Sequence, residues 1–184
     1  NSKITILEHY IGLTNVSYLT NAVSQFNLAN NSQLSHIRLQ EEDDASHHIG
    51  FTRYNIEADS FLKSSFITNG AVLCRNDIKI NFTAQGSHAQ INGLSVTKDN
   101  QHHDKHIIVN HSNSECQSDQ LFKFVLSDNA SGVFNGKVVV GEDTKSTNAN
   151  QSNKNLVLSP SAVMNANPQL EIYAEDVKCS HGST

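Results

Sequence analysis

Nine consecutive residues show most clearly how this chain folds: Gly132-Val133-Phe134-Asn135-Gly136-Lys137-Val138-Val139-Val140. The run has the length of one β-strand, and its second half is continuously apolar apart from Lys137. Similar alternating or apolar runs lie on both sides of it, at residues 4–7, 16–19, 33–39, 89–96 and 170–174. No stretch repeats apolar residues at the helical positions i, i+3, i+4 and i+7 for long enough to indicate a helix. The sequence therefore predicts an all-β protein.

Clusters of turn-forming residues separate these runs, at positions 30–32, 85–87, 113–115, 141–143 and 159–161. The small or apolar residues that follow polar turns recur every 27 or 28 positions, at Leu34, Phe61, Ala89, Cys116 and Thr144. A fixed repeat of about 20–50 residues is typical of solenoids. At roughly 3.3 Å per residue, one repeat makes a coil of two or three short strands. This spacing favours a right-handed parallel β-helix forming a single domain over residues 1–184, with a β-sandwich or barrel as the alternative.

The composition fits this fold and excludes several classes of function. Asn and Ser supply 44 of the 184 residues, and such small polar side chains suit tight bends and hydrogen-bonded ladders between stacked coils. The formal charge is -5 and no long basic run occurs, which argues against a nucleic-acid surface. No window has the roughly 18–20 apolar residues of a membrane span. The three widely spaced cysteines do not form a disulfide framework, and the simplest expectation is a cytoplasmic protein with free thiols.

Two internal segments carry residues suited to chemistry. The densest group of potential metal ligands is Gln101 to His106 together with His111, although a polar turn or strand face explains it better than a zinc, iron or copper site. If the segment is a strand, Asp104 and His106 share one face with His102. The segment 132–137 lacks the spacing of a phosphate-binding loop and has Val138 where Ser or Thr would hold magnesium, so we expect no ATP to bind.

Scattered acids offer a different class of function. Carboxylates that line the groove of a β-helix can cleave carbohydrate, and Asp77, Asp128 and Asp143 are the candidates here. We therefore keep a polysaccharide lyase or glycosidase as the alternative function.

The last residues, Asp176-Val177-Lys178-Cys179-Ser180-His181-Gly182, form the other candidate site. On a strand, Cys179 and His181 project to the same face because they are two residues apart. Thiolate and neutral imidazole both bind iron and iron–sulfur clusters. The neighbouring Lys178 is expected to lower the pKa of Cys179 modestly.

The stretch from Pro168 to Thr184, containing Leu-Glu-Ile-Tyr-Ala-Glu-Asp-Val-Lys-Cys-Ser-His-Gly, resembles the signature of the SufD branch of the SufB/SufD family, which belongs to the SUF machinery for iron–sulfur cluster assembly. The resemblance extends to residues 101–106, 121–128, 132–140 and 150–159, and it is most specific over residues 70–184. Ser183 stands where Ala is more usual in the family, a change expected to be neutral. The helical segments that flank the family's β-helix have no counterpart in this chain, which leaves binding to SufC in doubt and suggests a core fragment.

The resemblance implies a cluster assembly subunit without enzymatic activity of its own. Such a subunit pairs with SufB on the ATPase SufC, and helps to acquire iron and form a transient iron–sulfur cluster at the SufB–SufD interface. His181 matches the family's candidate for an interfacial iron ligand, and Cys179 lies beside it. The isolated core is expected to form a homodimer through the surface that otherwise meets SufB. The sequence leaves four points open. They are whether a flavin takes part, which cluster forms, which molecule donates the iron, and whether His181 binds iron directly.

Overall fold

The computed structural model describes residues 2–12 and 16–184 and consists of β-strands joined by short turns. No helix occurs among these residues, and consequently none that could cross a membrane. The strands are β1 (Lys3–Ile11), β2 (Leu19–Leu28), β3 (Gln33–Glu41), β4 (His47–Ile56), β5 (Phe61–Asn69), β6 (Leu73–Phe82), β7 (His88–Thr97), β8 (His102–His111), β9 (Gln117–Leu126), β10 (Ser131–Val140), β11 (Thr147–Val157), β12 (Val163–Ile172) and β13 (Val177–Ser183).

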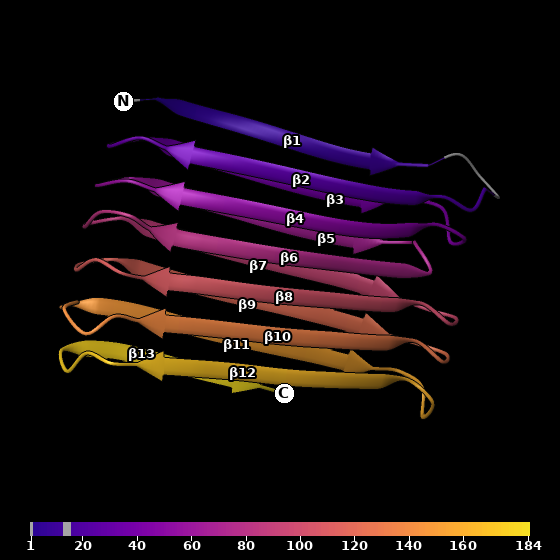
Figure 1. Cartoon of the computed structure of the whole chain (residues 1–184). Helices are drawn as coiled ribbons and strands as arrows, with labels where there is room; N and C mark the ends of the chain where they lie inside the picture. Colours follow the sequence, from indigo (N-terminus) through magenta and orange to yellow (C-terminus); the bar gives the residue numbers. More distant parts are fainter. Residues whose placement is uncertain (1, 13–15) are drawn as a thin grey trace.

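The strands form two parallel sheets that together make a solenoid. The odd-strand sheet has the order β1-β3-β5-β7-β9-β11-β13, and the even-strand sheet has the order β12-β10-β8-β6-β4-β2. Each coil therefore contains two strands, one in each sheet. Figure 1 shows the even strands running one way in front and the odd strands returning behind them while the chain descends, which makes the coil right-handed. The predicted right-handed parallel β-helix is confirmed.

The true repeat differs slightly from the predicted one. Residues that occupy the same place in successive coils of the odd-strand sheet are Leu34, Leu62, Ala89, Ser118, Ala149 and Cys179. The predicted positions Phe61, Cys116 and Thr144 precede the equivalent residues because the spacing is not fixed and reaches 31 residues between Ser118 and Ala149. The turn between β10 and β11, for example, spans residues 141–146, whereas the turn between β2 and β3 spans only 29–32.

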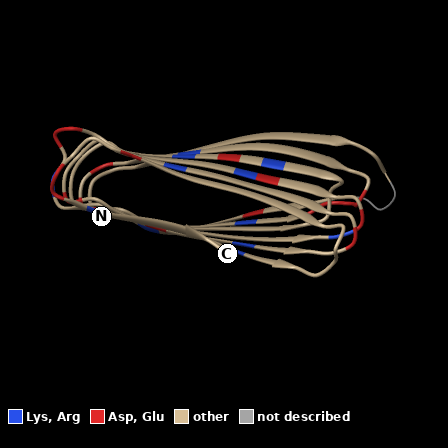
Figure 2. Cartoon of the chain, turned by 90° about the horizontal axis from the view of Figure 1, so that it is seen from below, with Lys and Arg blue, Asp and Glu red and all other residues tan. Residues whose placement is uncertain are grey.

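Most of the predicted strands and all of the predicted turn clusters are found. The exceptions lie at strand ends: residues 16–18 precede β2, and β12 ends at Ile172 although the sequence predicted a strand to residue 174. Figure 2, which looks along the stack, shows the two sheets as separate layers joined by bends, where many of the acidic residues lie. Several of these bends contain residues with positive φ, including Asn31, Asp59 and Asp128, a conformation that short polar side chains tolerate.

Side chains between the two sheets fill the lumen. Alternate residues of the strands from β3 to β10 point into it. Much of this core is apolar, and its largest buried members are Tyr54, Phe66, Phe82, Phe122, Phe124 and Phe134. Polar groups occupy the rest, including Arg38, His48 and Lys105, none of which is more than 2% exposed. Buried polar groups need hydrogen-bond partners, so this part of the lumen forms a defined network, which is described below.

Candidate functional site

The C-terminal strand β13 carries the two predicted iron ligands at the edge of the odd-strand sheet. Its register with β11 pairs Cys179 with Ala149 and His181 with Gln151. Ala149 and Gln151 are buried and face the lumen, and paired residues of neighbouring strands lie on the same side of a sheet. Cys179 and His181 therefore both face the lumen side of the last coil, as the period of two predicted.

Hydrogen bonds on either side of His181 define the orientation of the strand. Ser180 donates its hydroxyl to Asn150 Oδ1 at 2.8 Å on the outer face of the sheet. Ser183 donates to Oδ1 of the buried Asn153 at 3.0 Å on the inner face. Strand β13 is the last of its sheet, which leaves Cys179 half-buried and His181 exposed. No further strand of residues 2–12 and 16–184 pairs with β13 on its outer edge.

The electrostatics of Cys179 differ from the prediction. Burial raises the pKa of the Cys179 thiol, and a hydrogen bond with the backbone of Ala149 offsets only part of this effect. The expected lowering of this pKa by Lys178 is wrong, because adjacent residues on a strand point to opposite faces and Lys178 is exposed on the outer one. Cys179 is thus a neutral thiol, which would have to lose its proton to act as a metal ligand.

The His-rich segment proves to be part of strand β8, with alternate residues on opposite faces of the even-strand sheet. As predicted for a strand, Asp104 and His106 share the outer face, and His106 Nε2 lies 2.9 Å from Asp104 Oδ1. His102 is on the same face but bonds to Ser131 Oγ at 2.7 Å. His103 and His111 point into the lumen. The segment therefore splits between two faces, and no group of three or more His, Cys, Asp or Glu within residues 2–12 and 16–184 is arranged to hold a metal ion.

The acids considered for carbohydrate cleavage do not meet. Asp77 lies on β6 and is paired with Arg75 at 3.0 Å. Asp128 lies in the bend after β9, and Asp143 lies in the bend after β10, at the opposite ends of the strands. The residues 132–137, compared above with a phosphate-binding loop, form part of β10 instead.

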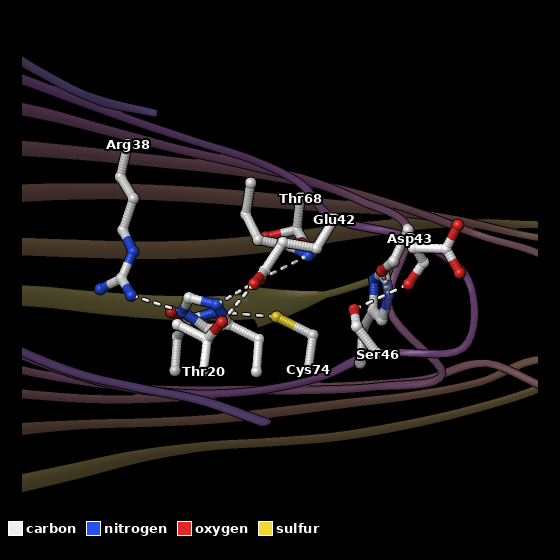
Figure 3. A network of polar contacts seen from close by, with 12 residues as sticks. Thr20, Arg38, Glu42, Asp43, Ser46, Thr68 and Cys74 are labelled. Carbon is white, nitrogen blue, oxygen red and sulfur yellow. Dashed lines mark hydrogen bonds and ion pairs between the residues drawn. The ribbon is translucent and has the colours of Figure 1, made fainter. Parts of the chain in front are cut away.

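Sequence reasoning missed a buried polar cluster between β3 and β8, seen from close by in Figure 3, where Arg38, Glu42, Thr68 and Cys74 are labelled. Arg38 Nη2 donates to His48 Nε2 at 2.6 Å, and His48 Nδ1 lies 2.5 Å from Glu42 Oε2. Thr20 donates its hydroxyl to the same carboxylate. The sequence did indicate that the Arg38 side chain points inward, because Arg38 lies two and four residues after His36 and Leu34 on the same face of β3.

The other half of the cluster contains a lysine and a thiol. Lys105 Nζ donates to Thr68 Oγ1 at 2.5 Å, and complete burial lowers the pKa of Lys105 to about 8. Asn76 Nδ2 donates to Cys74 Sγ at 3.2 Å, and burial raises the pKa of Cys74. Both residues lie several coils before β13, so the cluster is separate from the Cys179 and His181 pair.

Proteins of one family are similar to this chain over its whole length. The family model described as "SUF system FeS cluster assembly, SufBD core domain" matches residues 1–184. The iron-sulfur cluster assembly protein SufD of Escherichia coli (strain K12) is 35% identical over the whole chain, which covers 43% of that protein. A SufBD family protein of Synechocystis is 33% identical, and the chloroplastic protein ABCI7 of Arabidopsis thaliana is 32% identical. The chain spans 42% and 38% of these two proteins, respectively. From this match over its full length, the chain belongs to the SufBD core domain family of the SUF system for iron–sulfur cluster assembly.

Proposed function

We propose that this β-helix is the core of a SufD-type subunit, and that Cys179 and His181 supply ligands to iron or to a nascent cluster. The observation that carries the proposal is the position of the pair: a thiol and an imidazole share one face of the edge strand β13, at the uncovered end of the lumen. Thiolate and imidazole together suit iron. In this proposal iron is cargo that the subunit helps to load.

Two ligands do not complete an iron site, so a partner has to supply the others. A SufB-type scaffold that meets the β13 end would place its own ligands opposite Cys179 and His181. ATP hydrolysis by a SufC-type subunit would then change how the two scaffolds meet and expose or close the shared site. The chain acts as an assembly subunit in the cytoplasm, and the separated positions of Asp77, Asp128 and Asp143 give no support to a carbohydrate-cleaving enzyme.

The test is the iron and acid-labile sulfide content of the full-length protein in complex with its SufB-type and SufC-type partners, purified without oxygen. We expect His181→Ala and Cys179→Ala each to lower cluster content several-fold while the complex still assembles. Ser180→Ala is the matched control, because Ser180 lies between the two ligands on the opposite face of β13. Equal cluster content in the wild type and in both ligand variants would show that this chain contributes no ligand.

A further inference from the structure

We infer that Gln151 is a positioning residue for His181, and that it orients the imidazole ring when the ring turns inward and donates to the side-chain oxygen Oε1 of Gln151. This inference rests on the proposed function, because it explains how an exposed histidine on an edge strand is oriented to bind iron. It starts from the register of the last two strands of the odd-strand sheet, in which Gln151 on β11 is directly paired with His181 on β13. Paired residues of neighbouring strands have backbones about 4.8 Å apart and side chains on the same side.

The amide of Gln151 is held on one side only. Its Nε2 donates to Gln120 Oε1 on β9 at 3.2 Å. Its Oε1 is buried and has no hydrogen-bond partner among the described residues. The exposed His181 has to turn its ring inward to reach this oxygen. Since the amide nitrogen is directed toward β9, the oxygen lies on the other side of the amide carbon, away from β9. The strand on that other side of β11 is β13.

The opposite sheet fixes the position of this amide. Gly136 on β10 faces Gln151 across the lumen, and a Cβ atom at Gly136 would lie only 2.1 Å from Gln151 Nε2. A side chain of any size at this position would displace the amide. The glutamine is therefore held between Gln120 on its own sheet and the backbone of Gly136 on the other sheet. Its side chain is only 3% exposed, so few alternative rotamers are open to it.

Leaving a buried carbonyl oxygen without a partner costs free energy, so a donor that reaches it is favoured. The ring N–H of His181 is such a donor, on the residue paired with Gln151. A histidine that donates one ring nitrogen to a fixed acceptor presents the lone pair of its other nitrogen, and this is how metal-binding histidines are commonly oriented. Gln151 thus selects the tautomer and ring orientation with which His181 meets iron.

The first measurement is the tautomer of His181 in the metal-free, full-length protein. Histidine labelled with ¹⁵N, assigned by comparison with His181→Ala, gives ring nitrogen shifts that distinguish the two tautomers at pH 8.5. We expect one tautomer to dominate in the wild type and a mixture of tautomers in Gln151→Leu. A mixture in the wild type, as in a free histidine, would overturn the inference whether or not any variant folds.

The second measurement is Fe²⁺ binding, without oxygen, by the full-length protein in complex with its SufB-type and SufC-type partners. Removing the partner that orients a metal-binding histidine typically weakens binding by about 10- to 100-fold, and we expect at least a tenfold loss in Gln151→Leu. Gln151→Glu keeps an acceptor oxygen and should retain both the single tautomer and most of the affinity. Gln117→Leu, which changes an exposed glutamine on β9, should match the wild type.

The positioning role of Gln151 and the proposed function can be disproved separately. If His181→Ala loses iron but Gln151→Leu keeps both the wild-type affinity and the single tautomer, Gln151 has no positioning role and the proposed function stands. If His181→Ala binds iron as the wild type does, the proposed function is wrong, and Gln151 then has no iron ligand to position.

Discussion

His111 is an ionisable side chain whose pKa is changed by burial in the lumen. Its ring stacks at a tilt on Phe82 with centroids 4.7 Å apart, and its Nε2 bonds to Ser118 Oγ at 2.8 Å. Burial lowers the pKa of His111 to about 4, which keeps the ring neutral at physiological pH. The unfolded chain, in contrast, would protonate this histidine near its ordinary pKa of about 6.5. The folded state therefore binds fewer protons than the unfolded state between these two values.

This difference makes stability depend on pH in a defined direction. Where the unfolded state holds the extra proton, the free energy of unfolding rises with pH, so the protein should lose stability as the pH falls from about 6.5 to about 4. His111→Gln, which keeps a hydrogen-bonding group near Ser118, should flatten this slope. The measurement is urea unfolding at several pH values between 4 and 7.5. His47→Gln, on the outer face of β4, is the control, and the prediction fails if both variants keep the wild-type slope.

At the scale of strands, an asparagine ladder ties the even-strand sheet together on its outer face. Asn55, Asn81 and Asn110 each donate a side-chain N–H to the asparagine of the preceding coil, at 2.8, 2.8 and 2.9 Å, beginning from Asn27. These residues are paired in register on β2, β4, β6 and β8. The ladder thus adds a side-chain bond to the backbone bonds between each pair of strands.

Asn81 is a ladder member with a partner on each side, so replacing it removes two hydrogen bonds. At about 0.5–1.5 kcal/mol for each bond, Asn81→Ala should lower the free energy of unfolding by about 1–3 kcal/mol. Chemical denaturation measures this loss. Asn165→Ala, at an exposed position on β12, should change stability by less than about 0.5 kcal/mol. Equal effects of the two substitutions would show that the ladder bonds do not stabilise the sheet.

Strands could be predicted where the alternation of side chains is visible within one short stretch of sequence. The run from Gly132 to Val140 lies within β10, and the alternation that places Cys179 and His181 on one face needs only the period of a strand. Closeness in sequence gave a wrong prediction for Lys178. Its charge was expected to lower the pKa of Cys179, but the two side chains point to opposite faces of the strand. Contacts between coils were not predictable, because they depend on a register set about 30 residues away. The pairing of Gln151 with His181 belongs to this class, and so does the contact of Lys105 with Thr68 in the buried polar cluster.

At the scale of the molecule, the solenoid ends in unpaired strand edges. Strands β1 and β2 form one end, and β12 and β13 form the other. Large apolar residues are exposed near both ends, among them Leu7 and Val23 at the first and Leu158 and Val163 at the second. Exposed edges with apolar side chains invite pairing with another chain. The end that carries Cys179 and His181 therefore has the properties of an interaction surface.

The core purified alone should self-associate through such an edge. Light scattering or sedimentation should show an average mass that rises with concentration. Val163→Lys places a charge on the edge strand β12 and should reduce the association, because charged edges resist pairing. Ile108→Lys, on the outer face in the middle of the sheet, is the control and should leave the association unchanged. A mass that stays at 20.2 kDa at every concentration would contradict the prediction.

The pairing of each strand with only the strands of the preceding and following coils also has a mechanical consequence. Because none of the strands β1 to β13 bridges distant coils, tension applied along the stack at the two ends would be resisted by one interface between coils at a time. Extension under force should then proceed as a series of similar small steps, each releasing about one coil of chain. The molecule would unfold coil by coil from its ends under force, and not in a single event.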